Sequence, residues 1–192
     1  MNSLTAWSSW TAILLGSWML ACTSNPEPTR FTNPSFDFGF VERVAVLPLE
    51  NLSEDRQAAA RATRLLITEL LASGAVDVVE PGEIQAVLDR IPGGGIPPTV
   101  DQVIAIGDTL QVQAVITGSV AQSDLVRSGT TSIPTVTLDL HMLETETGAS
   151  VWAATHTQQA ATFSTKVLGT GAEPISATTR KCIQELLKSL IG

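Results

Sequence analysis

The sequence predicts an α/β protein with a single mixed β-sheet of about five strands, flanked by about four helices and ending in a C-terminal helix. Residues 44–47 are apolar on both faces, which is typical of a central strand covered by helices on both sides. Residues 135–143 alternate between polar and apolar side chains, as a strand with one buried face does. Residues 178–192 repeat apolar side chains at helical spacing. Between these segments, helical and strand patterns follow one another in an order that one mixed sheet accommodates.

The first strand, at 44–47, is followed by a helix. Pro48 ends the strand because it has no N–H to donate. We expect Ser53 to cap the helix, with Glu54 and Asp55 in its first turn, where negative charge is favourable. Gly74 ends the helix. The buried face of the helix is expected to carry Ala59, Ala62, Leu66 and Leu70.

The remaining elements follow from the same two periodicities. Residues 91–98 are rich in glycine and proline and are expected to form a mobile loop. Residues 144–150 are expected to form a hairpin turn. The other predicted elements are strands at 76–80, 113–120, 135–143 and 151–158, and helices at 81–90, 99–110 and 178–192. The inward side chains of the strand at 135–143 are predicted to be Val136, Leu138, Leu140 and Met142.

Residues 1–21 contain no charged side chain and include an apolar run of about a dozen residues, Trp10 to Ala21, directly before Cys22. A membrane-spanning helix needs roughly 20 such residues, so the run fits the core of a secretion signal better. With Ala21 before it, the cysteine resembles the lipobox of bacterial lipoproteins. We therefore predict a lipoprotein signal peptide at 1–21 and lipid attachment at Cys22. The alternative is an ordinary N-terminal helix with a buried cysteine.

Residues 22–40 are predicted to form a lipid-anchored, proline-rich tether before an α/β domain at 41–192. From Cys22 to the first strand near Val44, such a tether reaches at most ~70 Å. Within it, Phe36, Phe38 and Phe40 alternate with other residues, which suggests a short strand with one aromatic face. These rings either pack on their own domain, which we favour, or form an interface with a neighbouring subunit.

The charge of the chain restricts its partners. The formal net charge is −8, and no basic stripe is present, so we expect no nucleic-acid partner. The same charge opposes binding to anionic lipid through side chains, so membrane attachment would depend on acyl chains on Cys22. Thr23 stands where an aspartate would indicate retention in the inner membrane. The predicted location is therefore the periplasmic face of the outer membrane of a Gram-negative cell.

The sequence offers no candidate catalytic, cofactor or metal site. Gly93–Gly95 lack the Lys-Ser or Lys-Thr of a phosphate-binding loop. Asp139 and His141 share one strand face, and His156 lies on the partner strand, but no spacing supplies further metal ligands. Cys182 falls on the apolar face of the last helix and is expected to be a core residue. We predict a protein without catalytic residues, cofactor or metal.

Four segments together carry a family resemblance. They are RVAVLPLENLS, VDVVEPGEIQAVLD, VQAVITGSV and VTLDLHMLETETGASVWAATH. In this order, after a lipobox, they resemble the superfamily of envelope lipoproteins that includes the curli secretion protein CsgG and the penicillin-binding-protein activator LpoB. The N-terminal domain of TolB is similar in fold. The resemblance covers most of residues 41–160, and its most specific part is the hairpin in which Gly148 makes the turn and Trp152 returns into the core. It implies a non-enzymatic domain that acts by protein–protein contact, sometimes as a ring, and it carries over no catalytic residue.

The resemblance suggests three functions, and the lengths of two inserts in the domain argue against one form of them. A membrane-spanning strand needs roughly 9–11 residues, so a spanning hairpin needs about 20 or more. The inserts at 123–134 and 159–173 have only 12 and 15 residues, so a pore built by this chain alone is not expected. We predict an outer-membrane adaptor that binds a periplasmic or envelope protein, and that also assembles as a homo-oligomer if it follows the ring-forming members. The alternatives are a subunit of a curli-type secretion assembly and an activator of a peptidoglycan synthase.

Overall fold

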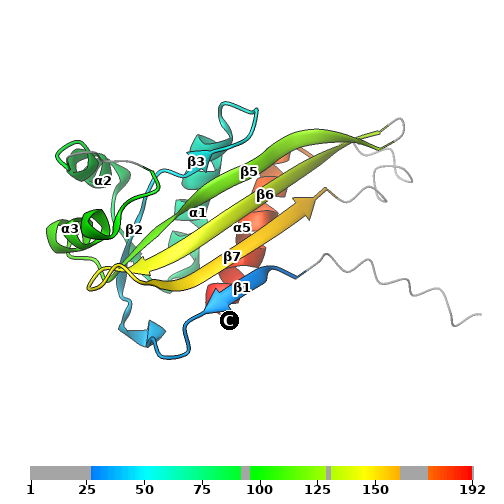
Figure 1. The fold of residues 1–192 in the computed structure, drawn as a ribbon. Coiled ribbons are helices and arrows are strands. Elements are labelled where there is room, and N and C mark those ends of the chain that lie inside the picture. Colours follow the sequence, from blue (N-terminus) through cyan, green and yellow to red (C-terminus); the bar gives the residue numbers. More distant parts are fainter. Residues whose placement is uncertain (1–26, 92–95, 129–130, 161–172, 192) are drawn as a thin grey trace, which may run out of the picture.

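The computed structural model describes residues 27–91, 96–128, 131–160 and 173–191. Within these ranges it confirms an α/β fold with one mixed sheet and a C-terminal helix (Figure 1). The helices are α1 (Ala58–Ser73), α2 (Pro81–Leu88), α3 (Val100–Leu110), α5 (Ile175–Ile191) and the short 3-10 helix η1 (Phe38–Phe40). The strands are β1 (Thr29–Thr32), β2 (Arg43–Val46), β3 (Glu50–Asn51), β4 (Asp77–Val78), β5 (Ala114–Ser128), β6 (Thr131–Glu144) and β7 (Ser150–Gln159).

The sheet has seven strands in the described part of the chain, where the sequence predicted about five. Their order is β1-β7-β6-β5-β2-β4, with β3 paired to β5 beyond the end of β2. The strands β4, β2 and β5 are parallel, whereas β5, β6, β7 and β1 are antiparallel to their neighbours. The two additional strands, β1 and β3, have four and two residues and carry no buried apolar pattern from which they could be predicted.

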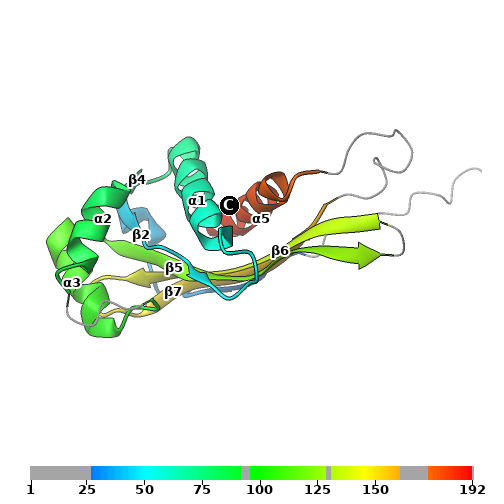
Figure 2. The same ribbon diagram turned by 90° about the horizontal axis from the view of Figure 1, so that it is seen from above.

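Two layers of helices cover the sheet, as Figure 2 shows. The helices α1 and α5 lie across one face, where Leu66, Leu70 and Leu186 join the main core. The helices α2 and α3 form a second core at the β2 and β4 end of the sheet. Alternate residues of the β2 segment enter the two cores, since Val44 belongs to the first and Ala45 to the second. This confirms the central strand that the apolar run predicted.

The segment that the sequence assigned to a tether is in part a strand. β1 pairs antiparallel with β7, and Thr29 lies opposite Thr155. The prediction that residues up to 40 form a tether is therefore wrong from Thr29 onward. Only seven residue steps separate Cys22 from Thr29, so the predicted lipid attachment site lies at most ~25 Å from the sheet, instead of ~70 Å.

The beginning of α1 also differs from the prediction. The helix starts at Ala58 after Gln57, not at Ser53, because residues 50–51 first pair with β5 as β3. Asn51 then organises the turn, since its Nδ2 donates a hydrogen bond to the backbone oxygen of Asp55 at 2.8 Å. The predicted end of α1 is confirmed, because Gly74 adopts a left-handed conformation with φ 64°.

The long hairpins of the sheet show the predicted inward residues and the predicted turn, and they exceed the predicted length. The inward residues of β6 from Val136 to Met142 are buried, and Gly148 makes the turn to β7 with φ 71°. β5 and β6 continue beyond the predicted strands, and Leu125 lies opposite Pro134. Most of the insert at 123–134 is therefore a projecting extension of the sheet. In the predicted loop at 91–98, residues 92–95 lie outside the described residues.

Trp152 is central to the main core. It is fully buried in β7, as predicted, and within the described residues its indole Nε1 has no hydrogen-bond partner. Its contribution to stability therefore comes from packing and burial, and not from a polar contact.

Replacing Trp152 with alanine should lower the free energy of unfolding by about 3–5 kcal/mol, because the change empties a core site. Trp152→Phe should cost clearly less, because it keeps an aromatic ring and removes a buried N–H that has no acceptor. Urea denaturation followed by circular dichroism measures both variants. A Trp152→Ala protein as stable as the unmodified one would contradict this role of Trp152 in the core.

Candidate interaction surfaces

The three phenylalanines that the sequence singled out lie around η1. They do not form the predicted strand, because Asp37 caps a 3-10 turn by accepting a hydrogen bond from the backbone N–H of Gly39 at 2.9 Å. The rings of Phe36 and Phe38 meet edge to face at 5.0 Å and pack against the main core. Phe40 is 57% exposed. The structure thus buries part of this segment on its own domain and leaves one ring at the surface.

An apolar hollow of about 200 Å³ lies beside η1. Residues from distant parts of the sequence line it, including Phe38 and Val41 before β2, Val76 after α1, and Leu190 and Ile191 at the end of α5. A second groove of about 460 Å³ runs between the C-terminal halves of α1 and α5 and shares Ile191 with the hollow. We give the name C-terminal apolar patch to the lining residues Phe38, Val41, Val76, Leu190 and Ile191 of the hollow, together with the exposed Phe40, which precedes Val41 at the end of η1.

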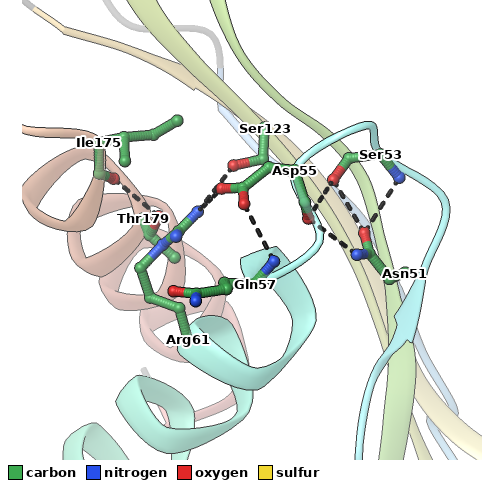
Figure 3. A network of polar contacts seen from close by, with 8 residues as sticks. All are labelled: Asn51, Ser53, Asp55, Gln57, Arg61, Ser123, Ile175 and Thr179. Atoms are coloured by element: carbon green, nitrogen blue, oxygen red, sulfur yellow. Dashed lines mark hydrogen bonds and ion pairs between the residues drawn. The ribbon is translucent and has the colours of Figure 1, made fainter.

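At the opposite end of α1, a polar network ties the helix to the sheet (Figure 3). Arg61 Nη2 donates hydrogen bonds to Asp55 Oδ2 at 2.6 Å and to Ser123 Oγ of β5 at 2.9 Å. Asp55 Oδ1 also accepts a hydrogen bond from the backbone N–H of Gln57 at 3.0 Å. The hydrogen bond from Arg61 is the main reason that the pKa of Asp55 lies below its ordinary value of 3.8, and the bond from the backbone of Gln57 lowers it further. The network fixes the start of α1 on β5.

The polar residues of the hairpin do not converge on a metal site. His141 Nε2 lies 3.0 Å from Asp139 Oδ2, and Thr155 Oγ1 donates to Asp139 Oδ1 at 2.7 Å. His156 is opposite Leu138 and is buried with it, so it points to the other face of the sheet. Among the described residues, no group of three or more His, Cys, Asp or Glu side chains could hold a metal ion.

Cys182 is a core residue, as its position in the helical pattern predicted. It is fully buried in α5, and its Sγ lies 3.4 Å from the backbone oxygen of His156. Burial raises the pKa of the thiol to about 12, which makes the reactive thiolate rare at neutral pH.

The end of the β5–β6 hairpin is a third exposed surface. Leu125 is 62% exposed and Val126 38% exposed, although both lie in a paired strand. The hairpin extends past the helical layer, as Figure 2 shows. Cys22 and Gly93–Gly95 lie outside the described residues. No helix in the described part of the chain is long and apolar enough to cross a membrane.

The surfaces assembled here combine residues that are far apart in the sequence. Arg61 and Ser123 are separated by 62 positions, and the C-terminal apolar patch joins Phe38 to Ile191. Residues so far apart in the sequence can be recognised as neighbours only once the strand order is known. The exposed Leu125 and Val126 carry a local signal, because they are adjacent apolar residues in a mostly polar insert.

No protein-family model matches this sequence, and comparison with the curated proteins gives no match. Solved structures do share the fold. The PelC dodecamer from Paraburkholderia phytofirmans is 18% identical, with a TM-score of 0.59 over 84% of this chain and 96% of that chain. Lipoprotein GNA1162 from Neisseria meningitidis is 12% identical, with a TM-score of 0.55 over 78% and 98%. The LpoB C-terminal domain from Salmonella enterica is 16% identical, with a TM-score of 0.50 over 65% and 86%.

These similarities concern the fold, because the sequence identities are low. They support the LpoB-like part of the resemblance that the sequence suggested. The neighbours described above do not support the CsgG part of that resemblance.

The Asp55–Arg61 pair should make stability depend on pH in the acid range. Since the folded protein lowers the pKa of Asp55, its contribution is complete above the ordinary value of 3.8 and is lost as the pH falls through the lowered value. Asp55→Asn should therefore reduce the free energy of unfolding by about 1 kcal/mol at pH 7. This difference from the unmodified protein should vanish in strong acid.

Denaturant titrations at pH 7 and at several lower pH values measure this dependence. Glu54→Gln removes one charge from the same loop and serves as the control, with no expected change. An equal loss for both variants would assign the effect to general charge and not to the network.

Proposed function

We propose that this protein is a lipid-anchored adaptor at the periplasmic face of the outer membrane, which acts by binding other proteins. The observation that carries the proposal is the C-terminal apolar patch, in which Phe40 and Ile191 are exposed and Phe38, Val76 and Leu190 are half-buried. Phe40 is exposed at the end of η1, and Phe38 at the start of η1 lines an apolar hollow of about 200 Å³. Exposed apolar surface next to a concave site is typical of protein-binding surfaces.

The fold supports the same proposal. Lipoprotein GNA1162 and the LpoB C-terminal domain share it at TM-scores of 0.55 and 0.50. Together with the lipobox pattern around Cys22, this supports an envelope lipoprotein, and we infer a non-enzymatic role because the sequence offers no catalytic set. PelC, another structure with this fold, is a dodecamer. We therefore include further copies of this chain among the partners of the apolar patch.

The short link to the anchor favours a partner close to the membrane. With at most ~25 Å between Cys22 and Thr29, the domain stays near the bilayer that holds its lipid. An activator of a peptidoglycan synthase, the alternative that the LpoB-like fold suggests, would have to meet its enzyme within the combined length of this link and the domain. A role in a secretion assembly at the outer membrane does not require a longer link.

The anchor is tested by the mass and the membrane fraction of the native protein beside a Cys22→Ala variant. We expect an acyl mass on Cys22 and recovery with the outer membrane for the native protein, and loss of both for the variant. An unmodified full-length chain in the soluble fraction would refute the envelope role and leave only the fold.

The interaction surface is tested by replacing Phe40 with serine. Because the ring is exposed, stability should change by less than about 0.5 kcal/mol. Crosslinked oligomers, or the partner recovered from solubilised envelopes, should decrease several-fold.

Leu52→Ser is the matched control, since Leu52 is 60% exposed and belongs to the β3–α1 loop. Equal recovery from both variants, with the protein monodisperse, would count against the patch as an interface.

A further inference from the structure

A hollow of about 550 Å³ lies between the first halves of α1 and α5. The described residues that line it are Gln57, Ala60, Arg61, Arg64, Leu65 and Ser176. Both helices begin on this side, because Arg61 of α1 and Ser176 of α5 meet here, whereas Glu69 further along α1 pairs with Arg180 of α5. The C-terminal apolar patch lies at the other end of the two helices, so the hollow is a separate surface.

The hollow is basic, although the chain is acidic. The formal net charge of the chain is −8, and all 19 of its aspartates and glutamates lie within the described residues. None of these carboxylates lines the hollow, and none forms an ion pair with Arg64. Arg61 is paired with Asp55 at 2.6 Å. The charge of Arg64 therefore stays uncompensated and makes the hollow positive.

The side chains of the hollow include hydrogen-bond donors that the described residues leave unused. Arg61 Nη2 donates to Asp55 and Ser123, which fixes the guanidinium, but its Nη1 makes no hydrogen bond within the described residues (Figure 3). The guanidinium of Arg64 and the hydroxyl of Ser176 have no such partner in that part of the chain either. Arginine presents its N–H donors in a planar fork that fits the oxygens of a phosphate group.

The positions of the two arginines are unfavourable for an isolated helix. Arg61 and Arg64 stand three residues apart on α1, where like charges repel one another. They also lie near the N-terminal end of α1, where the helix dipole disfavours positive charge. The first turn of α1 contains no acidic residue, and Gln57 makes no side-chain cap bond. A bound anion would reverse these unfavourable interactions.

We propose that this hollow binds a phosphate group, which accepts hydrogen bonds from Arg61 and Arg64 of α1 and from Ser176 of α5. A phosphate carries more negative charge and more acceptor oxygens than a carboxylate, so it suits donors from three side chains better. The volume of the hollow lies within the range of small-molecule sites, which leaves space for the organic part of a phosphate ester. The site depends neither on lipid at Cys22 nor on the C-terminal apolar patch.

The test titrates the isotope-labelled full-length protein, in uncharged detergent, with glycerol phosphate at constant ionic strength, and follows the backbone amide signals by NMR. We expect saturable binding, with the largest shifts in residues 57–65 and at Ser176. Arg64→Gln should weaken binding about tenfold or more, because it removes a charged donor from the phosphate. The variant should keep its fold, since Arg64 is exposed and makes no ion pair with the acidic residues of the chain.

Arg90→Gln is the matched control. Arg90 follows α2, is exposed, and likewise makes no ion pair with the acidic residues, so the change removes the same charge far from the hollow. Binding to this variant should equal binding to the unmodified protein.

Three results would overturn the phosphate site. They are the absence of saturable binding, an equal loss of affinity in the Arg64→Gln and Arg90→Gln variants, and acetate binding as tightly as glycerol phosphate. Phosphatidylglycerol added to the micelles distinguishes the source of the phosphate. Displacement of glycerol phosphate by this lipid would assign the site to a lipid headgroup, and undisturbed binding would assign it to a soluble phosphate ester.

Discussion

The parallel pairing of β2 with β5 is the constraint on which the rest of the structure depends. Val44 lies opposite Ala114 and Val46 opposite Ile116, with apolar side chains alternating between the two cores. Because both faces of this pair are buried, neither strand can shift by one residue without exchanging its two sets of side chains. This register sets where β5 continues, and therefore where Ser123 meets Arg61 and where the hairpin leaves the helical layer.

The elements that the sequence predicts well are those whose side chains enter a core. β2, β6, β7 and the long helices were predicted because burial imposes a period of 2 or 3.6 residues on them. The strands β1 and β3 were missed because their pairing depends on backbone hydrogen bonds at positions that stay exposed or half-buried. The start of α1 was misplaced for a related reason. Ser53 and Asp55 have the residue types of a helix cap, but the turn after β3 uses them first.

The interaction surfaces were less predictable than the fold. The sequence pointed to Phe36, Phe38 and Phe40 as a unit, and the 3-10 turn divides them between the core and the surface. The apolar patch beside them needs Ile191, which only the packing of α5 on the sheet brings near. The polar residues of the hairpin did not indicate a shared site, since the side chain of His156 lies on the opposite face of the sheet from those of Asp139 and His141. Such arrangements depend on tertiary contacts, which a local pattern does not encode.

The position of β1 has a mechanical consequence. A pull on the lipid anchor proposed at Cys22 would reach the domain at Thr29 and act along the axis of β1, which pairs antiparallel with β7. Hydrogen bonds between antiparallel strands run across that axis, so the load would be shared by the whole ladder and would not open it one bond at a time. The edge strand β1 would thus be loaded in shear. Its four exposed residues, which add nothing to the core, would transmit any force between the proposed anchor and the domain.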